Sequence, residues 1–198
     1  MTNINGKTYA MNAITPMSPF YTPILKAIFF VLGHVKPLQT DLINLSFIHF
    51  ARWVVVKRNG FPQLSPKQHE ERIHYDYLLF FSNFNGTWNQ YIDAFSDVLA
   101  NGLNLIWRWS AKFPGSRPVS EFKRYIALVQ FDTDYYYVAY PRATANDVKA
   151  AHRVNAAFEE FARHSKDISP AEFGPAYLKF VTQVQADLGA TGIGPVGT

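Results

Sequence analysis

The chain has 198 residues, of which 48% are apolar and 17% are charged, and it contains no cysteine. A chain of this length and composition can bury a substantial core and is not of the disordered class. Without cysteine, disulfides, thiolate catalysis and cysteine-ligated zinc or iron–sulfur sites are excluded. The formal net charge of +4 is spread along the chain, so nucleic acid is not an expected partner.

Residues 1–44 are predicted to be a leader and an apolar segment that precede the domain. Met1 to Thr15 are small and polar, which indicates a loose leader. The apolar run that follows is too short to span a bilayer, which needs about 20 residues. Two interpretations of Phe20–Leu32 stay open: a short helix packed on the domain or on a partner subunit, and a foot lying on a membrane surface.

Residues 45–188 are predicted to form one α+β domain. Three segments rich in aromatic and β-branched residues are expected to be strands, and the first of them ends at a turn over 57–60. The three predicted strands are Phe47–Val56, Tyr77–Ser82 and Asp134–Tyr140.

Helices are predicted where apolar residues recur at spacings of three and four after a capping residue. One begins after Thr87 and ends at Asn101–Gly102, another follows Ser120, and a last one opens at Ser169–Pro170. A further helix begins at Thr144, and its predicted inward stripe is Val148, Ala151, His152 or Asn155, Phe158 and Phe161. Residues 189–198, at the end of the chain, are expected to be a disordered tail.

This order of elements indicates an antiparallel sheet with helices on one face. From about Ser46 to about Phe161 it resembles the ferredoxin-like unit of the dimeric α+β barrel proteins. The segments Ile48–Trp53, Ser82–Gly86 with Tyr91–Asp93, and Tyr137–Pro141 resemble a pattern in uncharacterised proteins grouped near the dye-decolourising peroxidases. The resemblance implies a homodimer in which two sheets face each other.

Haem is the cofactor that this resemblance suggests, and His152 would then be its proximal ligand. The Gly-x-x-Asp-Gly signature of the dye-decolourising peroxidases does not occur in the chain. Because this signature is missing, we expect a protein that works without a cofactor. No metal site is predicted.

Two side chains of the first predicted strand are the main candidates for chemistry. Arg52 lies among apolar residues, so its guanidinium needs an acceptor: a carboxylate such as Asp93 or Asp134, or a bound anion. His49 has the residue type of a general acid or base near neutral pH. Three residues apart on a strand, His49 and Arg52 point to opposite faces unless a bulge intervenes.

The leading hypothesis is a small-molecule enzyme that acts on a lipid-like or aromatic substrate in a sheet-lined pocket. Arg52 would clamp an anion and His49 would exchange protons, with Trp53, Asn83 and Tyr137 lining the pocket. The alternatives are a ligand-binding or membrane-surface module without catalysis, and a haem protein. The expected location is the cytoplasm, with or without contact to a membrane surface.

Overall fold

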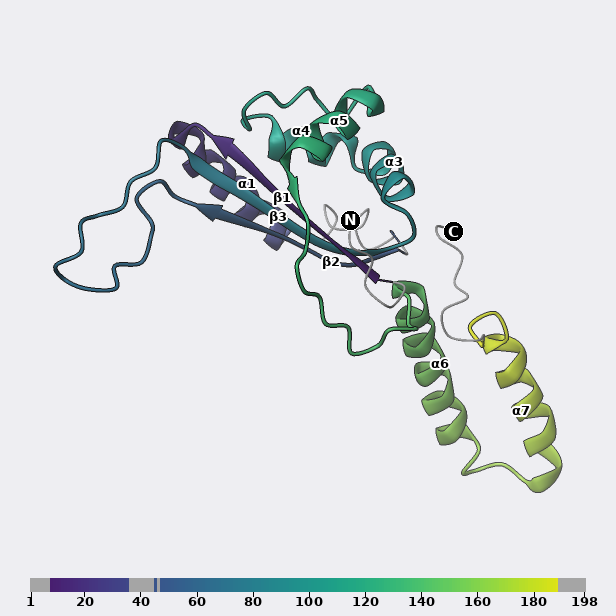
Figure 1. Cartoon of the computed structure of the whole chain (residues 1–198). Helices are drawn as coiled ribbons and strands as arrows, with labels where there is room; N and C mark the ends of the chain where they lie inside the picture. The colour runs from purple at the N-terminus through teal and green to yellow at the C-terminus, as the bar shows by residue number, and fades with distance from the viewer. Residues whose placement is uncertain (1–7, 36–44, 46, 189–198) are drawn as a thin grey trace.

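The computed structural model describes residues 8–35, 45 and 47–188. The predicted tail at 189–198 and the first seven residues of the predicted leader lie outside these ranges. The described chain is an α+β protein in which a long antiparallel sheet carries helices, and a helical hairpin stands away from it (Figure 1).

The sheet has four strands in the order β2-β3-β1-β4, and every pair of neighbours is antiparallel. The strands are β1 (Thr8–Met17), β2 (Ile48–Val56), β3 (Asp76–Asn85) and β4 (Gln130–Phe131). A helix follows β1, and three helices lie between β3 and β4. This β-α-β-β-α-β succession is compatible with a ferredoxin-like fold.

The loose leader predicted for the first 15 residues is wrong for Thr8 to Thr15, because they form most of β1. This strand pairs with β3 over its whole length, from Thr8 opposite Asn85 to Met17 opposite Asp76. The predicted division of the chain at residue 45 therefore separates a central strand from the sheet that it completes. The ferredoxin-like unit accordingly runs from β1 to β4.

The helices that cover the sheet all pack on one of its faces, as predicted. They are α1 (Thr22–His34), α3 (Trp88–Val98), α4 (Ala100–Trp107) and α5 (Val119–Val129), with a short 3-10 turn at Pro19–Tyr21. Leu25, Ile92 and Trp107 share a core with Phe80 and Phe84 of β3. Burial of these large side chains, each worth about 1.5–3 kcal/mol, fixes the covered face.

Local signals set the limits of several helices. Thr87 caps α3 through a capping box with Gln90, which confirms the predicted start. The predicted stop at Gly102 is wrong, because α3 already ends at Val98 and Gly102 lies inside α4. The buried side chains on either side, Leu103 and Ile106, hold this turn helical despite the glycine.

The third predicted strand, Asp134–Tyr140, is wrong. Of the described residues that follow α5, Gln130 and Phe131 alone pair with β1, opposite Ala13 and Asn12. The chain then leaves the edge of the sheet and crosses its uncovered face on the way to α6 (Figure 1). Three tyrosines of this segment, Tyr135, Tyr137 and Tyr140, stay largely exposed.

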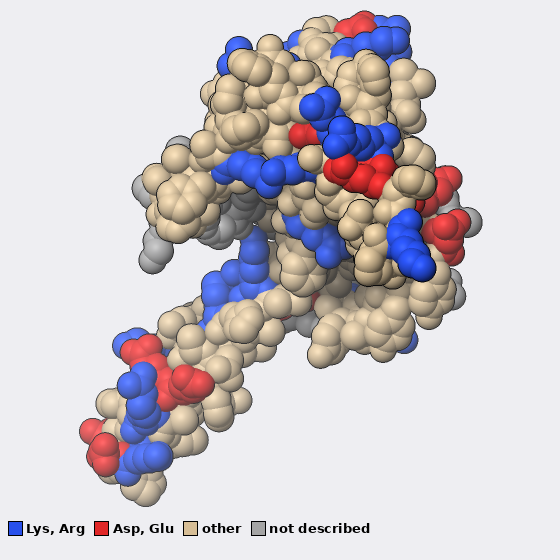
Figure 2. Space-filling view, turned by 90° about the vertical axis from the view of Figure 1, so that its left-hand side faces the viewer, with Lys and Arg blue, Asp and Glu red and all other residues tan. Residues whose placement is uncertain are grey.

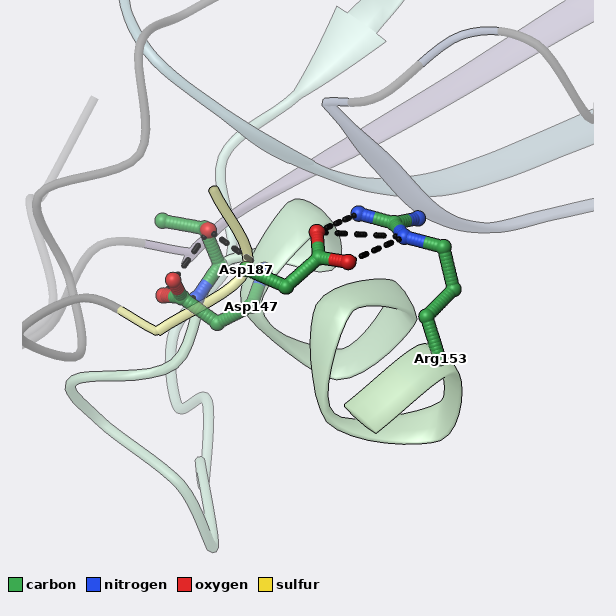
Figure 3. A network of polar contacts seen from close by, with 4 residues as sticks. Asp147, Arg153 and Asp187 are labelled. Atoms are coloured by element: carbon green, nitrogen blue, oxygen red, sulfur yellow. Dashed lines mark hydrogen bonds and ion pairs between the residues drawn. The ribbon is translucent and has the colours of Figure 1, made fainter. Parts of the chain in front are cut away.

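The last two helices, α6 (Ala145–His164) and α7 (Pro170–Val184), form a hairpin that we call the arm. Both begin at the predicted capping boxes, Thr144 with Asp147 and Ser169 with Glu172. A two-pronged ion pair from Arg153 of α6 to Asp187, just after α7, ties the two helices together (Figure 3).

The predicted inward stripe of α6 is only partly correct. Phe161 faces α7, and its ring stacks on that of Phe180 at 5.1 Å. Phe158 also contacts Phe180, at 6.1 Å, although it stays 51% exposed. In contrast, Val148 is 45% exposed, and Ala151, His152 and Asn155 are exposed.

Candidate functional site

One face of the sheet carries no helix, and we call it the open face. The register places the residues of β2, β3 and β1 in rows across it: Arg52 lies opposite Phe81, which lies opposite Asn12. Burial alternates along each strand, so the neighbouring residues of these strands point into the core. The open-face positions are Ala10, Asn12, Ile14, Pro16, Phe50, Arg52, Val54, Val56, Tyr77, Leu79, Phe81 and Asn83.

Arg52 is the single charged residue among these positions. Its guanidinium lies over the ring of Phe81, 4.8 Å from the ring centre, and the side chain is exposed. The ion pairs between residues in the described ranges do not include Arg52. Asp93, one of its two expected partners, is paired with Lys123 at 2.7 Å instead. A guanidinium held by a ring and open to solvent keeps its donors available to an anion.

Asn83 provides a second polar group on the open face. Its Nδ2 donates to the Tyr136 hydroxyl oxygen at 2.6 Å, so the hydroxyl hydrogen is left to donate elsewhere. Partial burial raises the pKa of Tyr136, which keeps the phenol protonated. Asn12 holds the same crossing segment through Thr133 Oγ1 at 2.8 Å. Arg52 and Asn83 occupy diagonal positions on the adjacent strands β2 and β3. Residues in such positions are typically about 7–8 Å apart.

Two of the predicted pocket residues lie elsewhere. Trp53 points to the covered face, where its ring contacts Phe80 and Trp107 at 5.1 and 6.1 Å. It therefore cannot line a pocket with Arg52, because alternation puts adjacent residues on opposite faces. Tyr137 is 74% exposed, and its neighbour Tyr136 makes the contact with Asn83. Of the three predicted lining residues, Asn83 alone lies on the open face with Arg52.

His49 belongs to a different cluster, at the end of the sheet. A β-bulge between Ile48 and Phe50 leaves His49 as the extra residue. Its Nε2 shares a hydrogen bond with the Thr8 hydroxyl at 3.2 Å, and its ring also pairs with Asn85. Burial lowers the pKa of His49 below 6.5, although the Asn85 contact opposes this, so the ring is neutral at pH 7.

This cluster connects the sheet to the arm. Asn85 Oδ1 accepts a hydrogen bond from the backbone N–H of Ala145, the first residue of α6, at 2.9 Å. Lys149 Nζ donates to the Leu45 carbonyl oxygen, which fixes the next turn of the helix. Because the contacts of His49 join β1, β2 and β3 to α6, they indicate a structural role. His49 and Arg52 have different neighbours, so the predicted pairing of acid/base and anion clamp is not formed.

His152, the haem candidate, lies on α6 and is exposed. A proximal ligand needs an apolar pocket that encloses the macrocycle, whereas His152 and its neighbours Ala151 and Arg153 are exposed. The described residues around His152 therefore do not fit a haem site.

Two hollows lie away from the open face. One, of about 420 Å³, runs between the arm helices beside Phe161, His164 and Lys179. The other, of about 490 Å³, lies beside Asn104, Arg108 and Phe113. Both are shallow and open to solvent, and neither contains a predicted site residue.

Comparison with models of protein families, with curated proteins and with solved structures finds no match to this chain. The resemblance to proteins near the dye-decolourising peroxidases stays a prediction. The polar contacts of Tyr136, Thr8 and Asn85 were not predicted from the sequence. Asn85 carried a signal, since it ends a strand beside Gly86 and precedes the Thr87 cap, but Thr8 lay in the assumed leader.

Proposed function

We propose that the open face binds an amphipathic organic anion. The observation that carries this proposal is Arg52, which is the single charge among the apolar and aromatic side chains of that face and has no ion-pair partner in the part of the chain that the structure describes. The anionic group would bind the guanidinium, and the apolar part would lie on Phe50, Val54 and Leu79. Tyr136 would donate a hydrogen bond to a second ligand oxygen.

The contacts support binding and not a particular reaction. The predicted acid/base, His49, is occupied in the cluster that joins the sheet to the arm. The enzyme hypothesis therefore needs another proton-transfer group. The Tyr136 hydroxyl lies beside Asn83 of the open face, but its pKa is raised. It therefore acts as a hydrogen-bond donor rather than as a base.

A second copy of the chain is the proposed cover of the open face. Phe50 and Val54 are 72% and 42% exposed, and an apolar patch of this kind on a sheet marks an interaction surface. Two fully packed sheets lie about 10 Å apart with the space between them filled by side chains, so a bound ligand would replace part of that layer. This is the dimeric α+β barrel arrangement that the sequence resemblance implies.

Calorimetric titration with decanoate and with decanol tests the proposal, because the two ligands share an apolar chain and differ in charge. Decanoate is expected to bind at least about 10-fold more tightly, since a hydrogen bond to a charged group contributes about 1.5–3 kcal/mol. Equal affinities would show that Arg52 contributes nothing. No binding of either ligand would reject the open face as an apolar site.

A membrane surface is a second candidate partner, and exposed apolar side chains of α1 and of the turn before it favour it. Ile24 and Val31 of α1 are 43% and 48% exposed, and Phe20 of the 3-10 turn is 76% exposed, whereas Leu25 is buried. Within the described ranges, every helix is too short or too polar to cross a bilayer. Flotation with vesicles containing phosphatidylglycerol tests this candidate, and Ile24→Asp should abolish flotation if these side chains are the contact.

A further inference from the structure

The arm carries a mainly apolar stripe that its own two helices cover only in part. On α6 the stripe consists of Val148, Ala151, Asn155, Phe158 and Ala162. The intervals between these residues alternate between three and four, which is the heptad spacing of a helix–helix seam. The same spacing recurs on α7 at Gly174, Tyr177 and Val181, and Tyr177 is 48% exposed. We call the two together the outer seam.

The outer seam borders the contact that forms the hairpin. That contact is centred on Phe161, Phe180 and the buried Val184. Two rings of the seam also touch it, because Phe158 lies 6.1 Å from Phe180 and Tyr177 lies 6.0 Å from Phe161, yet both rings stay about half exposed. Each helix of a four-helix bundle packs against two neighbours. The exposed side of the seam gives the arm the pattern of half a bundle. Figure 2 shows the arm standing clear of the rest of the molecule, with charged side chains of both signs along it.

We infer that the outer seam packs against the outer seam of a second copy of this chain, with the two α6 helices antiparallel. A two-fold axis between residues 155 and 156 would bring Phe158 of one copy against the small side chains Ala151 and Asn155 of the other. Large side chains would then meet small ones on both sides of the axis, as close packing requires, and at the axis Asn155 would face its own copy.

The charges beside the seam favour the same pairing. His152 and Glu159 each follow a seam residue directly, so they lie on the same edge of the stripe. When the two α6 helices run antiparallel, the same edge of the stripe in one copy meets that edge in the other. His152 of one copy then lies opposite Glu159 of the other. The imidazole can donate to the carboxylate at both ends of the interface. Asn155, which bonds Glu159 Oε1 at 3.0 Å within one chain, lies next to the axis and would fix the register.

Single cysteines test this inference directly, because the chain has none of its own. Asn155→Cys should give a disulfide-linked dimer under mild oxidation, since the two sulfurs would meet near the axis. Ala156→Cys is the matched control, one residue further on but facing away from the seam. It should stay monomeric on a denaturing gel. Equal cross-linking of the two variants, or none by either, would overturn the inference.

A second pair of variants measures assembly without a cross-link. Ala151→Glu puts a charge in the seam, whereas Ala156→Glu makes the same change on the opposite side of α6, and both alanines are exposed. In sedimentation velocity, only Ala151→Glu should weaken self-association, by at least 10-fold. Circular dichroism establishes that both variants keep their helices.

The arm contact is separable from the proposed sheet contact. Asn155→Cys combined with Val54→Asp should still cross-link, because Val54 lies on the open face and not on the arm. If the chain is a dimer but Asn155→Cys fails to cross-link, the arm inference is wrong and the sheet contact stands. If the double variant cross-links while decanoate binding is lost, the arm inference stands by itself.

Discussion

Replacement of Arg52 by alanine should separate ligand binding from folding. The side chain is exposed and its recorded contact is the ring of Phe81 at 4.8 Å. An exposed cation–π contact contributes about 0.5–1 kcal/mol. For a chain of this size, about 1 kcal/mol corresponds to about 2–4 °C in Tm. The expected fall in Tm for Arg52→Ala is therefore below about 4 °C.

The expected loss of decanoate affinity is much larger. A hydrogen bond to a charged group contributes about 1.5–3 kcal/mol, which is about 10- to 150-fold in Kd. Calorimetry gives the Kd, and thermal unfolding followed by circular dichroism gives the Tm. Arg58→Ala is the matched control, because Arg58 follows β2 in the adjoining turn and its side chain is exposed. Undiminished decanoate binding, or a Tm lowered by about 10 °C or more, would refute the reasoning.

Three further changes test the fold and the interface. Tyr91→Phe should lower the free energy of unfolding by about 1–3 kcal/mol in urea, because the buried Ser82 hydroxyl loses its partner at 2.8 Å. Adding Ser82→Ala should cost less than the sum of the two single changes, and strict additivity would contradict a shared bond. The wild-type Tm should fall as pH drops through 6.5, since the unfolded chain takes up the proton that the folded His49 resists, and His49→Gln should lose this slope. Val54→Asp should shift the sheet-mediated dimer toward monomer in sedimentation velocity, and an unchanged distribution would count against the sheet contact.

The parts of the fold that depend on local signals could be predicted from the sequence. The capping residues Thr87, Thr144 and Ser169 gave correct helix starts, since a side chain that bonds the first turn acts within three residues. The aromatic and β-branched runs gave β2 and β3 for a similar reason.

The parts that depend on distant pairing could not be predicted in this way. β1 mixes small and polar residues with Tyr9, Met11 and Ile14, and it is a strand because β3, some 60 to 80 residues away, pairs with it. The segment at 134–140 has the composition of a strand but finds no edge to pair with. The bulge at His49 has no marker such as glycine, and it decides where His49 points.

The stripe on α6 shows a third kind of limit. Periodicity correctly marks Val148, Ala151 and Phe158 as one apolar face, but it does not say what covers that face. Among the described residues α7 covers this face only in part, through the contact of Phe158 with Phe180, and the inferred second copy would cover the rest.

Photolabelling tests the central proposal most directly, because it reads out where a ligand lies. The probe is a decanoate analogue that carries a diazirine at the end of its chain, and the labelled peptides are identified by mass spectrometry. The open-face proposal predicts label on β2 and β3, at residues such as Phe50 and Phe81, and competition by decanoate. Label on Ile24 and Val31 of α1, with the open face unlabelled, would contradict it.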